Sequence, residues 1–174
     1  MSNMFSTLFR YQAWANGAFF DKLETMDQAR QEAEFHQAMR LMNHAYVVAE
    51  IFSAHLTGRT HSYKSANTEE TPKLSALRLA VAASDKWYLD YVRNVTPMQL
   101  AEKIAFSFTD GDKGYMSREE MITHIVLHGG YHRGEVGRIL TRLSVETPWD
   151  TLAVFLHRDD PERRRQGRLD LVHQ

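Results

Sequence analysis

The sequence contains no cysteine among its 174 residues. This absence excludes disulfide bridges, catalysis by a protein thiolate and zinc sites with cysteine ligands. Any metal ion must therefore be held by histidine, aspartate or glutamate side chains. A chain without disulfides also agrees with a location in the cytoplasm.

Long apolar runs and a strong net charge are missing as well. No segment is long and apolar enough to predict a membrane span. The N-terminal region, with Arg10, Asn16 and Asp21, does not have the pattern of a signal peptide. The net charge of −1 at pH 7 predicts no general attraction to nucleic acid or to an anionic membrane. The three arginines at 163–165 have acidic neighbours, so we interpret them as part of a solvated tail or last helical turn.

The composition is typical of a globular protein, with 43% hydrophobic and 25% charged residues. The chain length predicts one domain, over residues 1–174, with a sizeable core. Apolar residues recur with the helical period over residues 4–25, 32–57, 73–94 and 117–143, which predicts four long helices. We find no internal repeat, phosphate-binding loop or nucleophile motif.

The ends of these helices carry recognisable signals. Gly58 is expected to end the second helix, and the pair Thr96-Pro97 the third. Ser117 and Glu120 form the pattern of a capping box at the start of the fourth. Residues 102–115 alternate apolar and polar side chains around the turn Asp110-Gly111, which indicates a β-hairpin. The expected fold class is all-α: a four-helix bundle with a small β-hairpin before the last long helix.

An apolar patch follows Pro148. It should dock either on its own bundle or on a partner chain, because a patch of this size is costly to expose. Its residues are Trp149, Leu152, Val154, Phe155 and Leu156.

Three of the nine histidines lie close together on the last predicted long helix, as His124, His128 and His132. His128 and His132 fall in the apolar row of this helix and are expected to face the core. Buried imidazoles need partners, and a pair spaced i,i+4 can chelate one metal ion. A hydrogen-bonded core pair, or an exposed pair in a different register, stays open. The spacing does not decide between the pair His124/His128 and the pair His128/His132.

Two further features bear on this cluster. Gly129 and Gly130 suggest close packing or room for a ligand, because glycine lowers helix stability. On the second helix, His44 and His55 are about 16 Å apart by helical rise, so at most one can join the pair. His44 is the better candidate, since apolar residues flank it.

The motifs together resemble the DinB family of bacterial four-helix-bundle proteins, over nearly the whole chain. The resemblance is carried by Tyr11-Gln12-Ala13-Trp14-Ala15-Asn16, by Asn43-His44, by Asp110-Gly111 and by His128-Gly129-Gly130-Tyr131-His132-Arg133-Gly134. It implies a divalent metal ion, zinc or nickel, held by His44, His128 and His132, and it implies a homodimer. One departure is Glu135, where the family pattern usually has glutamine. We expect Glu135 to be an exposed helix residue, with a role as acceptor or extra ligand as the alternatives.

The resemblance also implies possible activities, namely thiol-dependent transferases and isomerases that use thiols such as bacillithiol or mycothiol. The expected function is therefore that of a divalent-metal-binding protein that acts on small molecules as a metal-dependent thiol S-transferase or isomerase. The alternatives are a non-catalytic protein that the metal stabilises, and a metal-dependent hydrolase.

Overall fold

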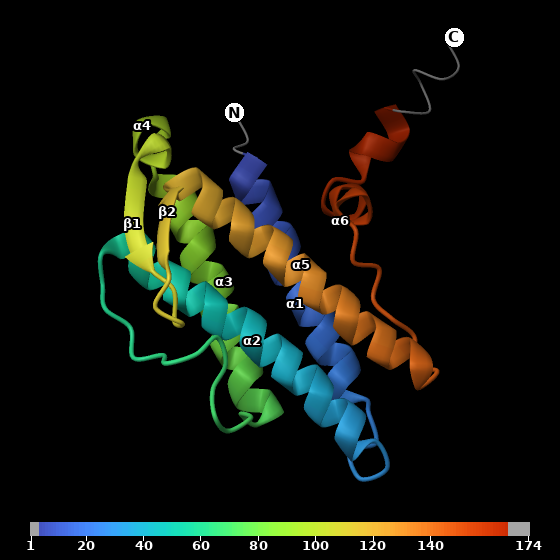
Figure 1. Cartoon of the computed structure of the whole chain (residues 1–174). Helices are drawn as coiled ribbons and strands as arrows, with labels where there is room; N and C mark the ends of the chain where they lie inside the picture. The colour runs from blue at the N-terminus through green and yellow to red at the C-terminus, as the bar shows by residue number, and fades with distance from the viewer. Residues whose placement is uncertain (1–3, 167–174) are drawn as a thin grey trace.

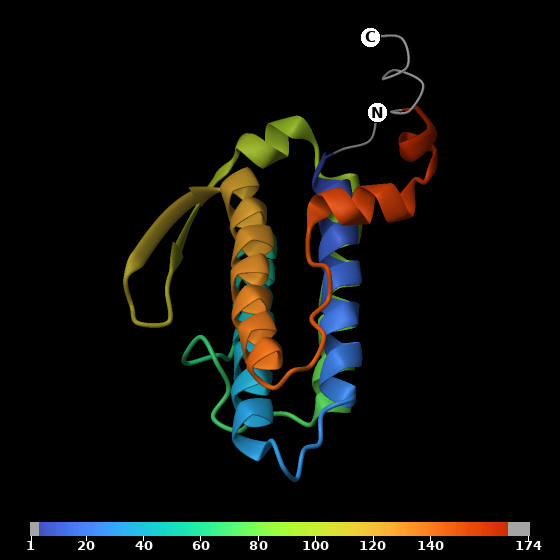
Figure 2. The same ribbon diagram turned by 90° about the vertical axis from the view of Figure 1, so that its right-hand side faces the viewer.

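A bundle of four long helices forms the body of the protein (Figures 1 and 2). The computed structural model describes residues 4–166. The four helices are α1 (Met4–Glu24), α2 (Glu32–Thr57), α3 (Leu74–Asn94) and α5 (Arg118–Arg142). Helix α1 packs mainly on α3, and α2 mainly on α5. The predicted all-α four-helix bundle is confirmed, and the bounds of the helices agree with the predicted ranges to within one residue.

The apolar core is divided into two clusters along the bundle. One cluster lies toward the hairpin end and includes Phe9, Phe52 and Tyr88. The other lies toward the α1–α2 loop and includes Phe19, Leu23 and Leu140. Several buried polar side chains lie on the same helices at positions between the two clusters: Gln12, Asn16, Ser84, Asp85 and Arg133. The bundle therefore has a polar layer near its middle.

The signals at the helix ends work as the sequence predicts. The Ser117 hydroxyl accepts a hydrogen bond from the Glu120 amide at 3.1 Å, and the Glu120 carboxylate accepts from the Ser117 amide at 2.6 Å. This capping box fixes where α5 begins. Gly58 ends α2 in the left-handed conformation, with φ 68°.

The hairpin consists of β1 (Lys103–Ser107) and β2 (Lys113–Ser117), paired antiparallel. The turn contains Gly111 at φ 96°, a conformation that favours glycine. Gly114 lies under the Phe106 ring, where an added Cβ would come within 2.3 Å of the ring. The predicted hairpin is confirmed, and its second strand continues to the residue that caps α5.

One local prediction is incomplete. The sequence pattern has Thr96-Pro97 ending the third helix, and α3 does end at Asn94, but Pro97 also begins a short helix, α4 (Pro97–Ala101). Proline is well tolerated at the first position of a helix, and Thr96 with Gln99 makes a second capping box there.

The apolar patch docks on its own bundle. Helix α6 (Leu152–Asp159) lies across α1 (Figure 2). The Phe155 ring is buried, 6.0 Å from the Tyr11 ring and 5.7 Å from the Trp14 ring. In the neighbouring arginine run, Arg163 pairs with Asp160 at 3.4 Å. The rest of the predicted charged tail, residues 167–174, lies outside the described residues. Within residues 4–166, no helix combines the length and hydrophobicity that crossing a bilayer requires.

Self-docking of α6 leaves one aromatic residue of the patch, Trp149, 68% exposed. The homodimer stays a prediction, and light scattering at high micromolar concentration should give twice the chain mass of 20.2 kDa. If Trp149 lies in the contact, Trp149→Ser should shift the mass toward that of the monomer. A monomeric wild type at that concentration would reject the homodimer.

Candidate metal centre

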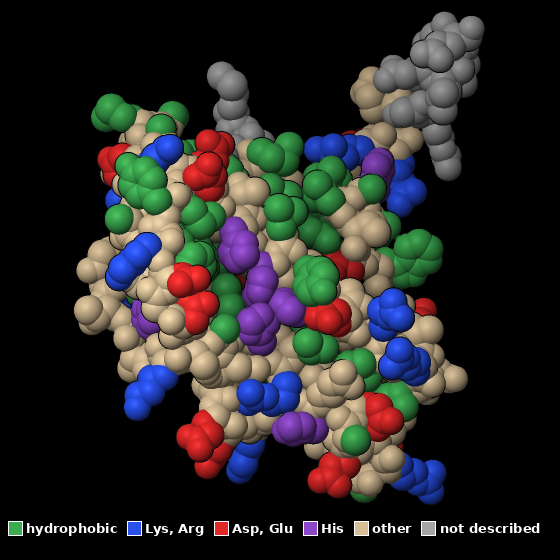
Figure 3. All heavy atoms as spheres, viewed as in Figure 1, with side chains coloured by type: hydrophobic (Ala, Val, Ile, Leu, Met, Phe, Trp, Pro, Cys, Tyr) green, Lys and Arg blue, Asp and Glu red, His purple; other side chains and the backbone are tan. Residues whose placement is uncertain are grey.

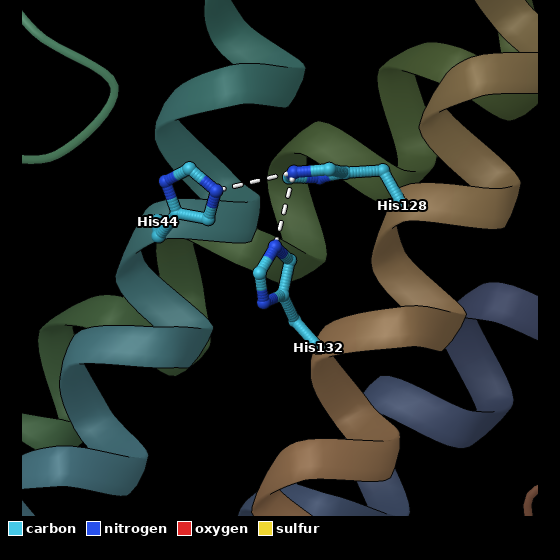
Figure 4. A group of neighbouring side chains, drawn as sticks. All are labelled: His44, His128 and His132. Carbon is cyan, nitrogen blue, oxygen red and sulfur yellow. Dashed lines mark hydrogen bonds between the residues drawn. The ribbon is translucent and has the colours of Figure 1, made fainter.

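Three histidine side chains meet between α2 and α5 (Figure 4). Helix α2 supplies His44, and α5 supplies His128 and His132 from successive turns. The Nε2 atom of His128 lies 3.1 Å from the Nε2 atom of His44 and 3.1 Å from that of His132. One ring nitrogen from each residue lies within 4.8 Å of the other two, so the group could hold a metal ion.

The outer nitrogens of two rings are held by acceptors. The Nδ1 atom of His44 is 2.6 Å from the Ala66 carbonyl oxygen. The Nδ1 atom of His132 is 2.6 Å from a Glu135 carboxylate oxygen. Carbonyl and carboxylate oxygens only accept hydrogen bonds, so both Nδ1 atoms carry the hydrogen and both Nε2 atoms present a lone pair. Glu135 is therefore an acceptor for His132, which is one of the two alternative roles, and its side chain is still 40% exposed.

This arrangement suits a cation. The single hydrogen that a neutral His128 ring can carry on Nε2 satisfies at most one of the two facing lone pairs. A divalent ion among the three nitrogens would satisfy all of them, and imidazole nitrogen is a good ligand for zinc and nickel. The donor set thus fits the metal that the resemblance implies.

Burial favours the neutral form of two of the three rings, those of His128 and His44. Burial lowers the pKa of His128 to about 3, and the nearby rings of His132, His44 and His124 act in the same direction. Burial also lowers the pKa of His44, against the effect of the Ala66 carbonyl. A metal ligand must be unprotonated, so these two rings are ready to bind at neutral pH.

The triad is open to solvent on one side. All three side chains are half-buried. In Figure 3 a group of histidine side chains reaches the surface on the face formed by α2 and α5. The sequence pattern predicts that His128 and His132 face the core, but the buried positions beside them belong to Gly129 and Arg133. The pair lies on the flank of α5 that faces α2.

The remaining candidates lie outside the triad. The His124 ring packs on Phe52 at 5.0 Å and on His128 at 5.2 Å. The His55 ring contacts the rings of Phe106 and His61. Within residues 4–166, one group of three or more potential metal ligands has its ligand atoms within 4.8 Å of one another. It consists of His44, His128 and His132. The structure therefore brings together the three residues that the resemblance implies.

Gly129 permits close packing behind the triad. A Cβ atom at this position would lie 3.2 Å from Nη1 of Arg133 and 3.2 Å from Oε1 of Gln12. Of the two interpretations of this glycine, close packing is the one that the structure supports.

A buried ionic network is the feature that the sequence analysis missed. Arg133 is 1% exposed. Its Nε donates to Asp150 at 2.8 Å, and its Nη1 donates to the Asn16 side-chain oxygen at 3.0 Å. Asn16 in turn donates to Asp85 at 2.9 Å, so α1, α3, α5 and the segment before α6 are joined directly behind the triad. Both Asn16 and Arg133 belong to the sequence motifs described above. The local sequence pattern gave no indication that the two side chains are hydrogen-bonded to each other.

Asp85 is the buried carboxyl group of this network. Burial raises its pKa to about 6, although hydrogen bonds from Asn16 and Gln12 and the charge of Arg133 lower it. The Oε1 atom of Gln12, in the same region, is buried without a hydrogen-bond partner among the described residues.

The comparisons with known proteins agree with the geometry. The model of the DinB family matches residues 1–165, nearly the whole chain. A search of curated proteins gives no match.

Replacing Asp85 by asparagine should reduce the pH dependence of stability. The carboxyl group has a pKa of about 6 in the folded protein against 3.8 unperturbed. Its contribution is therefore fully present below about pH 4 and is lost as the pH rises through about 6. Relative to the wild type, Asp85→Asn should gain about 2 kcal/mol in unfolding free energy between about pH 4.5 and 7.5.

Urea denaturation of both metal-free proteins measures this difference, because the histidines then titrate alike in both. Asp112→Asn in the exposed hairpin turn is the matched control and should follow the wild type. An identical pH dependence in Asp85→Asn and wild type would contradict the assignment.

Proposed function

The chain belongs to the DinB family, and on this premise we propose that it is a metal-dependent enzyme. The proposed reaction is a thiol S-transfer or an isomerisation of a small molecule. The proposed ion is zinc or nickel, held by His44, His128 and His132. The observation that carries the proposal is the convergence of three imidazole nitrogens at a partly buried position.

The number of ligands supports a catalytic site. Structural zinc sites usually have four protein ligands, whereas catalytic sites have three and leave a position for water or substrate. Glu135 is the nearest candidate for a fourth ligand, but its carboxylate is bonded to the Nδ1 atom of His132. The protein thus supplies three nitrogens, and the partly buried rings leave an approach from solvent.

The surrounding residues have positioning roles. The Ala66 carbonyl and the Glu135 carboxylate fix the tautomers of His44 and His132. A carboxylate that accepts from a ligating histidine also makes that imidazole a stronger donor. A bound divalent ion would supply Lewis acidity, which lowers the pKa of a thiol or water molecule that reaches it.

The nucleophile must come from outside, because the chain has no cysteine. A small thiol such as bacillithiol or mycothiol would lose its proton to solvent. Its sulfur would then form a bond to an electrophilic carbon as the leaving group departs. We propose the cytoplasm as the location of this reaction, since small thiols are kept reduced there.

The purified protein should contain about one divalent ion per chain. His44→Ala, His128→Ala and His132→Ala should each lose most of it, because two remaining nitrogens hold an ion poorly. Plasma mass spectrometry measures the content. His124→Ala is the matched control, since this half-buried histidine neighbours His128 but lies outside the triad, and it should keep its ion. Full occupancy in His128→Ala would exclude the site as assigned.

Thiol transfer should require the metal and the thiol together. The assay pairs bacillithiol, mycothiol, glutathione or cysteine with a chloro-dinitro-aromatic compound or an epoxide. Rates are compared for metal-loaded, chelated and His132→Ala protein, and only the first should exceed the background. A tightly held ion without acceleration by any thiol would favour hydrolysis, or a metal that only cross-links α2 and α5.

A further inference from the structure

A groove lies beside the triad, between α2 and α5. Its volume is about 520 Å³, within the range of small-molecule sites. Two of its lining residues contact the triad directly. Glu135 bonds to His132 at 2.6 Å, and the Tyr131 ring lies edge-on to the His132 ring at 5.0 Å. Leu41 and Ile139 add apolar surface.

The far part of this groove is positively charged. Arg138 and Arg142 line it from successive turns of α5, on the same side of the helix. Within residues 4–166, no carboxylate pairs with either guanidinium group, whereas Arg133 and Arg118 of the same helix both have acidic partners. Glu135 is the one acidic residue of the lining, and its carboxylate is bonded to His132. Two guanidinium groups are therefore available to an anion.

The positions of these arginines limit the size of the ligand. Each residue of an α-helix advances 1.5 Å, so Arg138 and Arg142 start roughly 9 and 15 Å beyond His132 along the axis. Their side chains lean back toward the N-terminal end of α5, which shortens the distance to the triad. A ligand that reaches both regions needs an anionic group many bonds away from its reacting atom. Free cysteine is too short, and a tripeptide-sized molecule is long enough.

We infer that the groove binds a carboxylate of a peptide-sized thiol cosubstrate, recognised by Arg138 and Arg142. Guanidinium groups bind carboxylates through paired hydrogen bonds, which suits two adjacent arginines at the end of a groove. The sulfur end of the same molecule would then lie at the triad. The inference rests on the proposed thiol-dependent function, but it makes a separate statement about binding.

The test uses S-methylglutathione, a thioether that keeps the carboxylates of glutathione and cannot react as a thiol. Binding to the full-length metal-loaded protein is followed by NMR titration and repeated after chelation. We expect saturable binding that weakens about tenfold in the double variant Arg138→Gln/Arg142→Gln. The control is Arg93→Gln, which removes the same charge from an exposed site on α3 and should bind as the wild type does.

The dimethyl ester of S-methylglutathione completes a thermodynamic cycle, in which acid and ester are each compared on the wild type and the double variant. In the wild type the ester should bind more weakly than the acid, and in the double variant the two should bind equally, because the preference depends on the arginines. Equal binding of the acid by wild type and double variant would overturn the inference, and so would the absence of saturable binding to the wild type. Both results are independent of transfer rates, so a failure here is distinguishable from a failure of the proposed reaction.

Discussion

The buried guanidinium group of Arg133 is the constraint on which the site depends. An isolated charge in a bundle core is strongly destabilising, so its partners must stay in place. Asp150 and Asn16 accept its hydrogen bonds at 2.8 and 3.0 Å. This contact fixes the rotation of α5 about its own axis. With Arg133 turned inward, the adjacent residue His132 and the residue one turn before it, His128, must face α2.

Because α5 is held in this orientation, two neighbouring stripes of the helix contact different parts of the protein. The inward stripe, with Gly129 and Arg133, packs against the polar layer of the bundle. The flanking stripe presents two imidazole rings to His44 across the interface with α2. Because the packing of α2 on α5 belongs to the fold itself, the triad needs no separate loop to assemble it. A metal ion would then join two helices that already touch, without a large rearrangement.

Sequence patterns predict what depends on residues near one another in the chain. The capping box of Ser117, the end of α2 at Gly58 and the hairpin turn at Gly111 are of this kind. The choice of His44 over His55 came from the apolar residues that flank His44. The choice of the pair His128/His132 over His124/His128 came from the family resemblance, because it depends on how two helices face each other. The bond between Asn16 and Asp85 joins residues 69 positions apart, and no local period encodes it. The burial of Arg133 was missed for the same reason, since a charged residue in an amphipathic helix is normally expected at the surface.

Glu135 connects the two halves of the proposed site. Its carboxylate holds the Nδ1 atom of His132, and its side chain also lines the groove that leads to Arg138 and Arg142. Glutamine, which the family pattern usually has at this position, would offer His132 a neutral oxygen. The carboxylate attracts the hydrogen on Nδ1 of His132 more strongly than a neutral oxygen would. It therefore makes the Nε2 atom a better electron-pair donor to a cation. It also places a negative charge between the triad and the arginines. An anionic ligand is therefore repelled from the near part of the groove and attracted to its far end, which favours one orientation with the reacting end toward the three histidines.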